Sequence, residues 1–304
     1  MGINVLRNLV KGPTWLAQSI SAATLDSVRS QSYPVSEIIV VNDGSSDKTA
    51  EILSNESNIR VIDQKNAGVS HARNAGIKAC QYDYIAFIDA DDIWLPDKIE
   101  NIVRLIELHP NAIGYYTYFH PWFEKDESKE AAISGIQSKQ QNYNIECDWI
   151  YHKQLITNHV LTSTAVIRRT TLADTGLFDT ELPVAEDWDL MLRLSRKGLF
   201  CKIEKPLTLY KLDHDSLTST IKTRDFASAV VNSAIVKYGY QSPDGQSVNI
   251  KDYKQRAYRR HLEYGALAYK SGQFDKAYKA FTSALTIKIT VKCFIYLVLS
   301  GLRK

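Results

Sequence analysis

The hydrophobic positions of this chain form short continuous runs separated by longer segments with helical spacing. The apolar runs at 38–41 and 84–88 are typical of strands that are buried on both faces of a parallel sheet. Residues 16–30, 49–53 and 70–80 carry the patterns of helices. Because strands and helices alternate, the pattern predicts an α/β fold, a doubly wound and mostly parallel sheet with helices on both faces.

The rest of the first two thirds of the chain continues this alternation. Residues 124–146 interrupt it, because they are rich in Glu, Lys, Ser and Gln and indicate a mobile surface excursion. Further strands are predicted at 60–62, 114–119, 163–168 and 200–210, and further helices at 97–108 and 187–197.

The character of the sequence becomes helical after residue 222, which predicts a first domain over 1–222 and a small helical region over 223–304. A single such helix pair cannot bury its apolar face alone, so we expect it to dock on the first domain or on a partner. One tetratricopeptide-like helix pair is indicated by Gly265, Leu267, Tyr269, Gly272, Phe274, Ala277, Phe281 and Ala284.

The segment 288–304 combines an apolar run with four basic residues, which suits an interfacial helix on an anionic membrane surface. A final core helix with a basic end explains the pattern equally well. No stretch reaches the roughly 18 apolar residues that a membrane span needs. Residues 1–10 also lack the long apolar core of a signal peptide.

Composition narrows the class of protein. With 304 residues and 44% hydrophobic content, the chain can bury a sizeable core. The net charge of +3 is small and dispersed, so no nucleic-acid partner is expected. The four cysteines (Cys80, Cys147, Cys201 and Cys293) lie far apart in the sequence, which favours reduced thiols over a disulfide framework or a zinc site.

Two clusters of acidic residues carry the candidate chemistry. Asp89, Asp91 and Asp92 directly follow the buried run 84–88 and would repel one another if left unpaired. A divalent cation resolves this repulsion, because hard cations prefer carboxylate oxygens. Helix capping is the alternative, although one Asp suffices for a cap. Glu186-Asp187 begin the later helix 187–197 and could supply a general base or, again, a cap.

Four segments together resemble family 2 glycosyltransferases, which adopt the GT-A fold. They occur in the order and at the spacing typical of that family, over about residues 8–220. The segments are Glu37–Thr49 (EIIVVNDGSSDKT), Asn66–Gly76 (NAGVSHARNAG), Phe87–Lys98 (FIDADDIWLPDK) and Glu186–Arg193 (EDWDLMLR).

The resemblance implies a role for each acidic cluster. Asp91 corresponds to a direct ligand of Mn²⁺ or Mg²⁺, and Asp89 to a contact with ribose or with metal-bound water. Asp187 corresponds to the general base, with Glu186 as its neighbour or as an acceptor ligand. His214 lies in a segment similar to the family's closing segment, where it would be a further metal ligand or touch the diphosphate; an exposed loop histidine is the alternative.

The same resemblance places the nucleotide. Asp43 would accept a hydrogen bond from the nucleobase, and Arg73 would reach the base or the phosphates. The loop that holds the base in the family corresponds to Pro13, Thr14 and Trp15. The strand before this loop would then be 8–12, which carries a Lys and a Gly where a central strand should be apolar. Either the first strand is therefore unusual or the N-terminus has diverged from the family, and either would affect recognition of the base.

As a whole, the resemblance implies an inverting, metal-dependent enzyme of the cytoplasm. It would move a sugar from a nucleoside diphosphate sugar, with a UDP-sugar as the first candidate, to a saccharide or lipid-linked saccharide acceptor in surface polysaccharide or glycolipid synthesis. The alternative is a catalytically weak GT-A domain that acts as a binding or scaffold module. A nucleotidyltransferase would need a better Gly-rich loop than 11–13, and an oxidoreductase would need the Gly-x-Gly-x-x-Gly motif, which does not follow a strand here.

Overall fold

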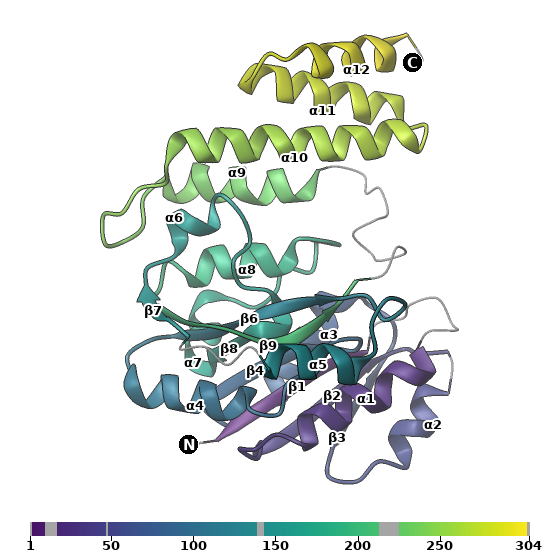
Figure 1. Ribbon diagram of the computed structural model, residues 1–304, viewed down its shortest axis with the longest axis vertical. Coiled ribbons are helices and arrows are strands. Elements are labelled where there is room, and N and C mark those ends of the chain that lie inside the picture. The colour runs from purple at the N-terminus through teal and green to yellow at the C-terminus, as the bar shows by residue number, and fades with distance from the viewer. Residues whose placement is uncertain (1, 10–16, 47, 139–142, 213–224, 303–304) are drawn as a thin grey trace. The chain divides into compact units, whose positions relative to one another are not determined.

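The computed structural model describes residues 2–9, 17–46, 48–138, 143–212 and 225–302, and the side chains of these ranges apart from 4–9 and 17–22. It divides into two compact units (Figure 1). The first unit comprises 1–148, 160–190 and 197–213, and the second comprises 149–159, 191–196 and 214–304. The domain boundary expected at 222 falls outside the described residues and stays a prediction.

The first unit is built on one mixed sheet with the strand order β3-β2-β1-β4-β8-β6-β9-β5, and β7 also pairs with β9 (Figure 1). The strands from β3 to β4 run parallel, whereas β8 runs antiparallel to both of its neighbours. The α/β class is therefore confirmed, with a parallel half and a mixed half. The strands are β1 (Ile3–Leu9), β2 (Glu37–Asp43), β3 (Arg60–Gln64), β4 (Tyr84–Asp89), β5 (Ile93–Trp94), β6 (Gly114–Trp122), β7 (Ile145–Asp148), β8 (Ala165–Arg168) and β9 (Phe200–Lys211).

Helices cover both faces of this sheet, as the continuous apolar runs require. On one face, Ile38 and Val40 of β2 join a core with residues of α1, α2, α4 and α5. Ile39 and Val41 alternate with them, are fully buried, and point to the opposite face, where α3 packs on β1 and β2. The helices of the first unit are α1 (Ala17–Arg29), α2 (Thr49–Ser54), α3 (Val69–Ala79), α4 (Lys98–Leu108), α5 (Lys129–Gln137) and α7 (Arg169–Thr175), with the short 3₁₀ turn η1 (Thr162–Thr164). Helix α8 (Glu186–Leu194) begins in the first unit and ends in the second.

The first strand differs from the sequence prediction. The described strand β1 spans Ile3–Leu9, so it begins five residues before the expected strand at 8–12, whose residues 10–12 lie outside the described ranges. It lies between β2 and β4 and pairs in parallel with both of them over six positions each. The error arose because the strand was positioned by counting back from the loop at 13–15, whereas the apolar residues that form it lie further upstream. The central strand of the sheet is regular.

The described parts of the polar segment, 124–138 and 143–146, also contain more regular structure than the sequence suggested. They include α5, whose Ala132 and Ile136 are buried in the main core. The segment then leads into β7, which pairs antiparallel with β9. The interpretation as a mobile excursion was wrong because two apolar residues one turn apart suffice to hold a short helix, and strand pairing depends on a partner more than fifty residues away.

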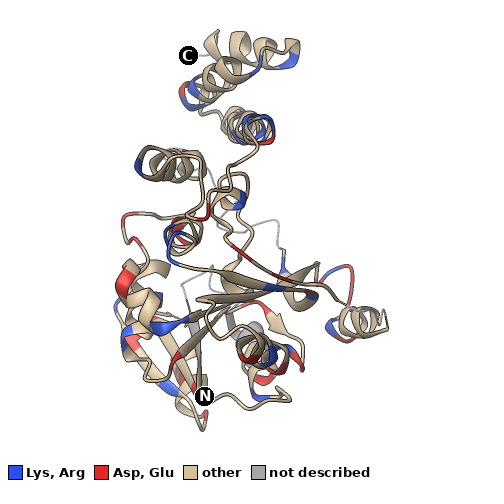
Figure 2. Cartoon of the chain, turned by 90° about the vertical axis from the view of Figure 1, so that its left-hand side faces the viewer, with Lys and Arg blue, Asp and Glu red and all other residues tan. Residues whose placement is uncertain are grey.

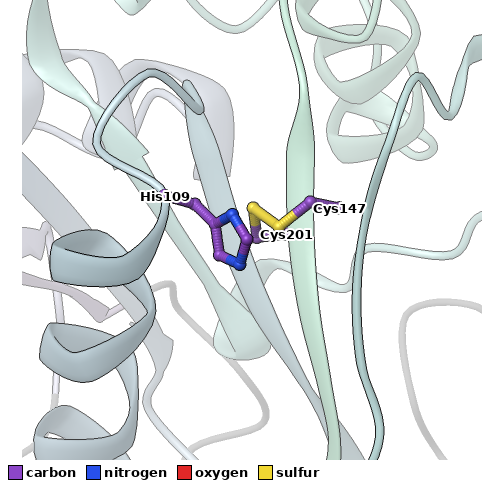
Figure 3. A group of neighbouring side chains, drawn as sticks. All are labelled: His109, Cys147 and Cys201. Carbon is purple, nitrogen blue, oxygen red and sulfur yellow. A yellow bond between two sulfur atoms is a disulfide. The ribbon is translucent and has the colours of Figure 1, made fainter.

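Two of the cysteines correct the expectation of reduced thiols. Cys147 of β7 and Cys201 of β9 lie directly opposite each other in the ladder and form a disulfide (Figure 3). The sequence hid this pair, because 54 positions separate the two residues and only the fold brings them together. The ring of His109 lies next to the two sulfurs, within 4.8 Å (Figure 3). Cys80 and Cys293 are free and buried, in agreement with the expectation.

The second unit contains α6 (Tyr151–Gln154), α9 (Phe226–Tyr238), α10 (Ile250–Lys270), α11 (Phe274–Ile287) and α12 (Val291–Gly301). The small residue Gly265 of α10 touches the ring of Phe281 on α11, and a Cβ atom at Gly265 would meet that ring at 2.7 Å. Small residues thus lie where the two helices meet, as the sequence pattern predicts. Among the described residues, no helix is both long and apolar enough to cross a membrane.

Candidate active site

Three elements bring the two acidic clusters to the carboxyl edge of the parallel strands. Strand β4 ends at Asp89, and its register places Asp89 beside Asn8 of β1. Helix α8 begins at Glu186, so the second cluster stands at a helix N-terminus, where acidic side chains are favoured. Helix α3, which packs on β1 and β2, contributes Arg73 to the same site. This edge is the usual position of ligand sites in open α/β sheets.

Arg73 connects the two clusters. Its Nη1 donates to Glu186 Oε1 at 2.6 Å, and its Nη2 donates to Asp89 Oδ1 at 2.8 Å. Burial alone would lower the pKa of the guanidinium, but the charges of Asp89 and Glu186 outweigh burial and raise it. The Arg73 side chain also lies over the ring of Phe178, 5.1 Å from the ring centroid. Arg73 therefore stays charged and holds acids from β4 and α8 together.

Asp187 is an acid whose pKa is shifted to near neutral pH. Burial, followed by the charge of Glu186, raises the pKa of Asp187 from 3.8 to about 7, although the charge of Arg73 opposes the shift. The residue keeps part of its surface exposed, and its Oδ1 accepts from the backbone N of Trp188 at 2.7 Å. A carboxylate with a pKa near neutral pH suits proton abstraction.

The backbone before Glu186 is strained. Ala185 has φ 62°, a left-handed conformation that costs a residue with a Cβ roughly 1–2 kcal/mol. Residues held in such conformations cluster at functional sites when the surrounding structure imposes them. Here the turn at Ala185 sets the direction in which α8 leaves, and with it the positions of Glu186 and Asp187.

The first cluster separates into an exposed and a buried part. Asp91 is exposed and the side chain of Asp89 is 31% exposed, whereas Asp92 is buried. Asp92 Oδ1 accepts from the backbone N of Lys211 at 2.9 Å, and its Oδ2 has no hydrogen-bond partner among the described residues. Burial, then the charges of Asp91 and Asp89, raises the pKa of Asp92 well above 3.8. Asp92 is thus the buried member of the first cluster, and it contacts the backbone of β9.

The donor set at this edge fits a hard divalent cation that shares its ligands with a substrate. Within the described residues, no three acidic side chains bring their oxygens within 4.8 Å of one another. A complete protein cage for a cation is therefore not formed by these residues. Mg²⁺ and similar ions are commonly held by one or two carboxylates together with substrate phosphates. The carboxylates of Asp91 and Asp89 are of the type that such a shared site uses.

Asp43 organises a loop. It is fully buried at the end of β2, where Oδ1 accepts from Gln64 Nε2 at 2.7 Å and from Ala67 N at 2.9 Å. Its Oδ2 accepts from Gly68 N at 2.8 Å. Gly44 allows this arrangement, because its φ of 71° and its close approach to the backbone of Asn66 leave no room for a side chain. Asp43 therefore fixes the 66–68 loop that leads into α3.

The order of these elements and residues can be compared with known proteins. The sequence profile described as Glycosyl transferase family 2 matches residues 13–173, which is more than half of the chain. This chain is a family 2 glycosyltransferase. The GT-A fold and the enzyme class that the four motifs predict are thereby confirmed.

The relatives are bacterial enzymes. The glycosyltransferase is 30% identical over 208 residues to the Escherichia coli UDP-Glc:alpha-D-GlcNAc-diphosphoundecaprenol beta-1,3-glucosyltransferase WfaP, which covers 67% of this chain and 76% of WfaP. It spans between 30 and 65% of the length of the other curated relatives considered. Among them is the poly-beta-1,6-N-acetyl-D-glucosamine synthase of Staphylococcus aureus strain COL, 30% identical over 66% of this chain and 48% of the synthase.

Solved structures share the fold. Staphylococcus aureus TarS 1-349, in complex with UDP-GlcNAc, matches all of this glycosyltransferase and 85% of its own chain, with a TM-score of 0.65 and 16% identity. The mannosyltransferase PcManGT from Pyrobaculum calidifontis, in complex with GDP-Man and Mn²⁺, matches 99% of this chain and 79% of its own, with a TM-score of 0.56 and 16% identity.

The structure brings together five of the site residues that the sequence singled out: Asp89, Asp91, Arg73, Glu186 and Asp187. Asp43 lies at the end of the neighbouring strand β2. Pro13, Thr14, Trp15 and His214 lie outside the described residues, so their assigned roles stay predictions.

Sequence reasoning gave no role to Tyr210, which the structure places in the site. Burial, then the charges of Asp92, Asp89 and Asp187, raises the pKa of its phenol, so acids of both clusters act on the same side chain. Ser163 was also missed, although its hydroxyl accepts from the backbone N of Asp89 at 3.0 Å. Tyr210 lies in β9 and Ser163 in η1. These two elements are distant in the sequence, so no local sequence pattern pointed to either residue.

Proposed function

We propose that this glycosyltransferase moves a sugar from a nucleoside diphosphate sugar to a hydroxyl acceptor, with inversion at the anomeric carbon and with the help of Mn²⁺ or Mg²⁺. The observation that carries the proposal is the bridge from Arg73 to both acidic clusters, which holds Asp187, with its pKa of about 7, next to the carboxylates at the end of β4. This arrangement pairs a general base with a site for the departing diphosphate.

Asp187 is the proposed base. Glu186 makes a buried ion pair with Arg73, and its side chain is only 11% exposed, so it is engaged in structure. Asp187 is a partly exposed residue with a raised pKa, which suits removal of a proton from the acceptor hydroxyl. A single displacement assisted by one base reverses the anomeric configuration. Glu186 is accordingly proposed as a positioning residue in place of an acceptor ligand.

Arg73 is proposed to act on the donor through the acids that it holds. Two of its nitrogens are committed to Glu186 and Asp89, and its side chain is 5% exposed. It therefore orients Asp89 for a contact to ribose or to metal-bound water. Asp43, with both oxygens engaged by 64–68, is proposed to shape the nucleobase pocket through that loop.

Asp91 is the proposed direct ligand of the cation, with Asp89 beside it and His214 as a further candidate ligand. The bound cation would neutralise the negative charge that develops on the departing diphosphate. The chain's own contribution is to keep Asp91 accessible while Asp92 remains buried beneath it. The ion pair at Arg73 limits the repulsion among the acids before the cation arrives.

The relatives suggest the substrates. The name of WfaP specifies UDP-Glc as donor and a diphosphoundecaprenol-linked sugar as acceptor, and TarS was solved with UDP-GlcNAc. We therefore propose a UDP-sugar donor and a saccharide or lipid-linked saccharide acceptor, in the synthesis of a surface polysaccharide, glycolipid or teichoic acid. Nucleoside diphosphate sugars are cytoplasmic metabolites, so the proposed place of action is the cytoplasm.

A catalytically weak binding module is the less favoured function. Its main support was an irregular first strand, and β1 is regular and pairs fully with both neighbours. The acids and the arginine that links them are all present.

The test is a thermal-shift and calorimetry series with UDP, GDP and ADP, each with and without Mn²⁺. A ligand that binds the folded state raises the melting temperature by mass action. Asp91→Asn should lose the Mn²⁺-dependent part of nucleotide binding, because it removes the ligand charge. Asp83→Asn is the matched control, since Asp83 is an exposed acid just before the opposite end of the same strand β4.

Binding of UDP that requires Mn²⁺, that is lost in Asp91→Asn and that is kept in Asp83→Asn would support the proposal. Equal binding by wild type and Asp91→Asn would overturn the metal assignment. NMR of the transferred sugar's anomeric proton then tests inversion: a product with the donor's anomeric configuration would rule out the single displacement.

A further inference from the structure

Helix α12 presents an apolar stripe to solvent. The exposed residues recur at intervals of three and four along the helix and just past its end, so they share one face. Soluble helices normally turn this kind of face towards a core. The stripe consists of Val291 (78% exposed), Phe294 (57%), Ile295 (51%), Val298 (43%), Leu299 (38%) and Leu302 (80%), and Ile289 (84%) precedes it.

The opposite face of α12 is already packed. Cys293 is fully buried in a small core with Phe281 and Ala284 of α11. The ring of Tyr296 stacks on Phe281, with centroids 5.3 Å apart, and also meets Tyr269 of α10. Because this face holds the helix on α10 and α11, the outer stripe has no role in the core of the unit.

The start of α12 is fixed as well. The hydroxyl of Thr290 caps the helix by accepting from the backbone N of Cys293 at 3.3 Å. The same hydroxyl bonds with Tyr258 Oη of α10 at 2.6 Å. The helix is therefore formed and oriented before any partner binds, and binding would not need to order it.

Charge identifies the partner. The sequence carries no Asp or Glu after Asp275, whereas six residues in that stretch are basic: Lys276, Lys279, Lys288, Lys292, Arg303 and Lys304. Lys288 and Lys292 are exposed and flank the start of the stripe, and in Figure 2 the ribbon of α12 carries blue and no red. Lysine is depleted at protein–protein interfaces, whereas anionic lipid surfaces attract it.

We propose that α12 binds the surface of an anionic phospholipid membrane and lies in its plane. The stripe would enter the boundary between headgroups and acyl chains, and Lys288 and Lys292 would contact the lipid phosphates. At 11 residues the helix is far too short to cross a bilayer. This inference is independent of the proposed glycosyl transfer, since it rests only on the residues of α10, α11 and α12.

The test is co-sedimentation of the full chain with vesicles of phosphatidylcholine, with and without phosphatidylglycerol, at low and high sodium chloride. Wild type should bind the phosphatidylglycerol vesicles, and more weakly at high salt, because salt screens the lysines. Phe294→Ser combined with Ile295→Ser should weaken binding by about ten-fold or more, since each removes an apolar side chain that the membrane would bury. These residues are more than half exposed, so circular dichroism should show an unchanged fold.

Two further variants separate the contribution of the apolar stripe to vesicle binding from that of the lysines. Val236→Ser is the matched control, because Val236 of α9 is an apolar residue that is 88% exposed in the same unit; it should bind as wild type does. Lys288→Gln combined with Lys292→Gln should weaken binding to the anionic vesicles by about five-fold for each lysine and leave neutral vesicles unaffected.

Three results would overturn the proposal. Wild type could fail to sediment with anionic vesicles. The Phe294/Ile295 variant could bind as tightly as the Val236 control. Light scattering could show a dimer that the Phe294/Ile295 variant converts to a monomer while neither binds vesicles; the stripe would then be an interface between two copies of the chain.

Discussion

Replacing Asp187 with Asn should destroy activity and stabilise the fold at the same time. Asn keeps the shape of the side chain and can still accept from Trp188 N, so α8 keeps its first contact. It cannot accept a proton. We expect kcat to fall by about 10²-fold or more, the usual scale for a positioned base, with little change in donor or metal affinity. The activity of wild type, measured as kcat/KM, should fall about ten-fold for each pH unit below about 7.

The stability effect follows from the same pKa. Because the carboxyl pKa rises from 3.8 to about 7 on folding, the folded protein binds more protons between these values, and its stability falls as pH rises through that window. The full shift corresponds to about 4 kcal/mol. Because Asp187 is partly exposed and interacts with the charges of Glu186 and Arg73, we expect a smaller effect on the free energy of unfolding, about 1–2 kcal/mol.

The assay is thermal unfolding of both proteins between about pH 4 and pH 8, with turnover measured on the same samples. The variant should melt a few degrees above wild type at the alkaline end, and the difference should vanish at the acid end. Glu181→Gln is the control, because it removes an exposed acid from the segment before α8 and should change neither property. A variant that melts below wild type at about pH 8 would refute the desolvation argument. Near-normal turnover would refute the base assignment, and a dead Glu186→Gln beside it would move the base by one residue.

Three further substitutions, one of them with a control, test interactions that hold the first unit together. Arg73→Lys keeps the charge but cannot bridge two carboxylates with two nitrogens, so urea denaturation should show a loss of about 2–3 kcal/mol; an unchanged midpoint would contradict the bridge. Ala185→Gly should raise stability by about 1 kcal/mol by relieving the left-handed backbone, whereas Ala173→Gly inside α7 should lower it by a similar amount. Cys147→Ala should lower the free energy of unfolding by up to about 4 kcal/mol and abolish the response of the melting temperature to a thiol reductant. If the reductant leaves the melting temperature of wild type unchanged, the disulfide contributes nothing to stability.

The sequence predicted the parts of the fold that depend on local patterns. The buried runs at 38–41 and 84–88 became β2 and β4, and the acids that follow β4 lie at the carboxyl edge, as the topology requires. The helix expected at 70–80 is α3, with one residue of difference at each end. In each case the pattern within one short window decides both the element and the side of the sheet on which its end falls.

The predictions that were wrong concern residues whose partners lie far away in the sequence. Strand β7 exists because β9 offers it an edge, and the Cys147–Cys201 bond follows from that pairing. Neither has a signal within its own segment. The prediction of reduced thiols rested on the wide spacing of the four cysteines along the sequence, and that spacing does not reveal which of them meet in the fold. Likewise, only the tertiary structure shows that Arg73 faces the acids instead of solvent.

The candidate site contains several features that oppose folding, and Arg73 offsets one of them, the raised pKa of Asp187. Asp187 and Asp92 are acids in surroundings that disfavour their charge, and Ala185 has a strained backbone. Arg73 forms ion pairs with one acid of each cluster, Asp89 and Glu186, which are neighbours of these residues. If the proposed cation also binds at Asp91, it adds charge of the same sign on the exposed side, so it should relieve Asp92 more than it relieves Glu186. Arg73 would then matter most for stability before substrate and metal arrive, and metal binding should make the fold less sensitive to Arg73→Lys.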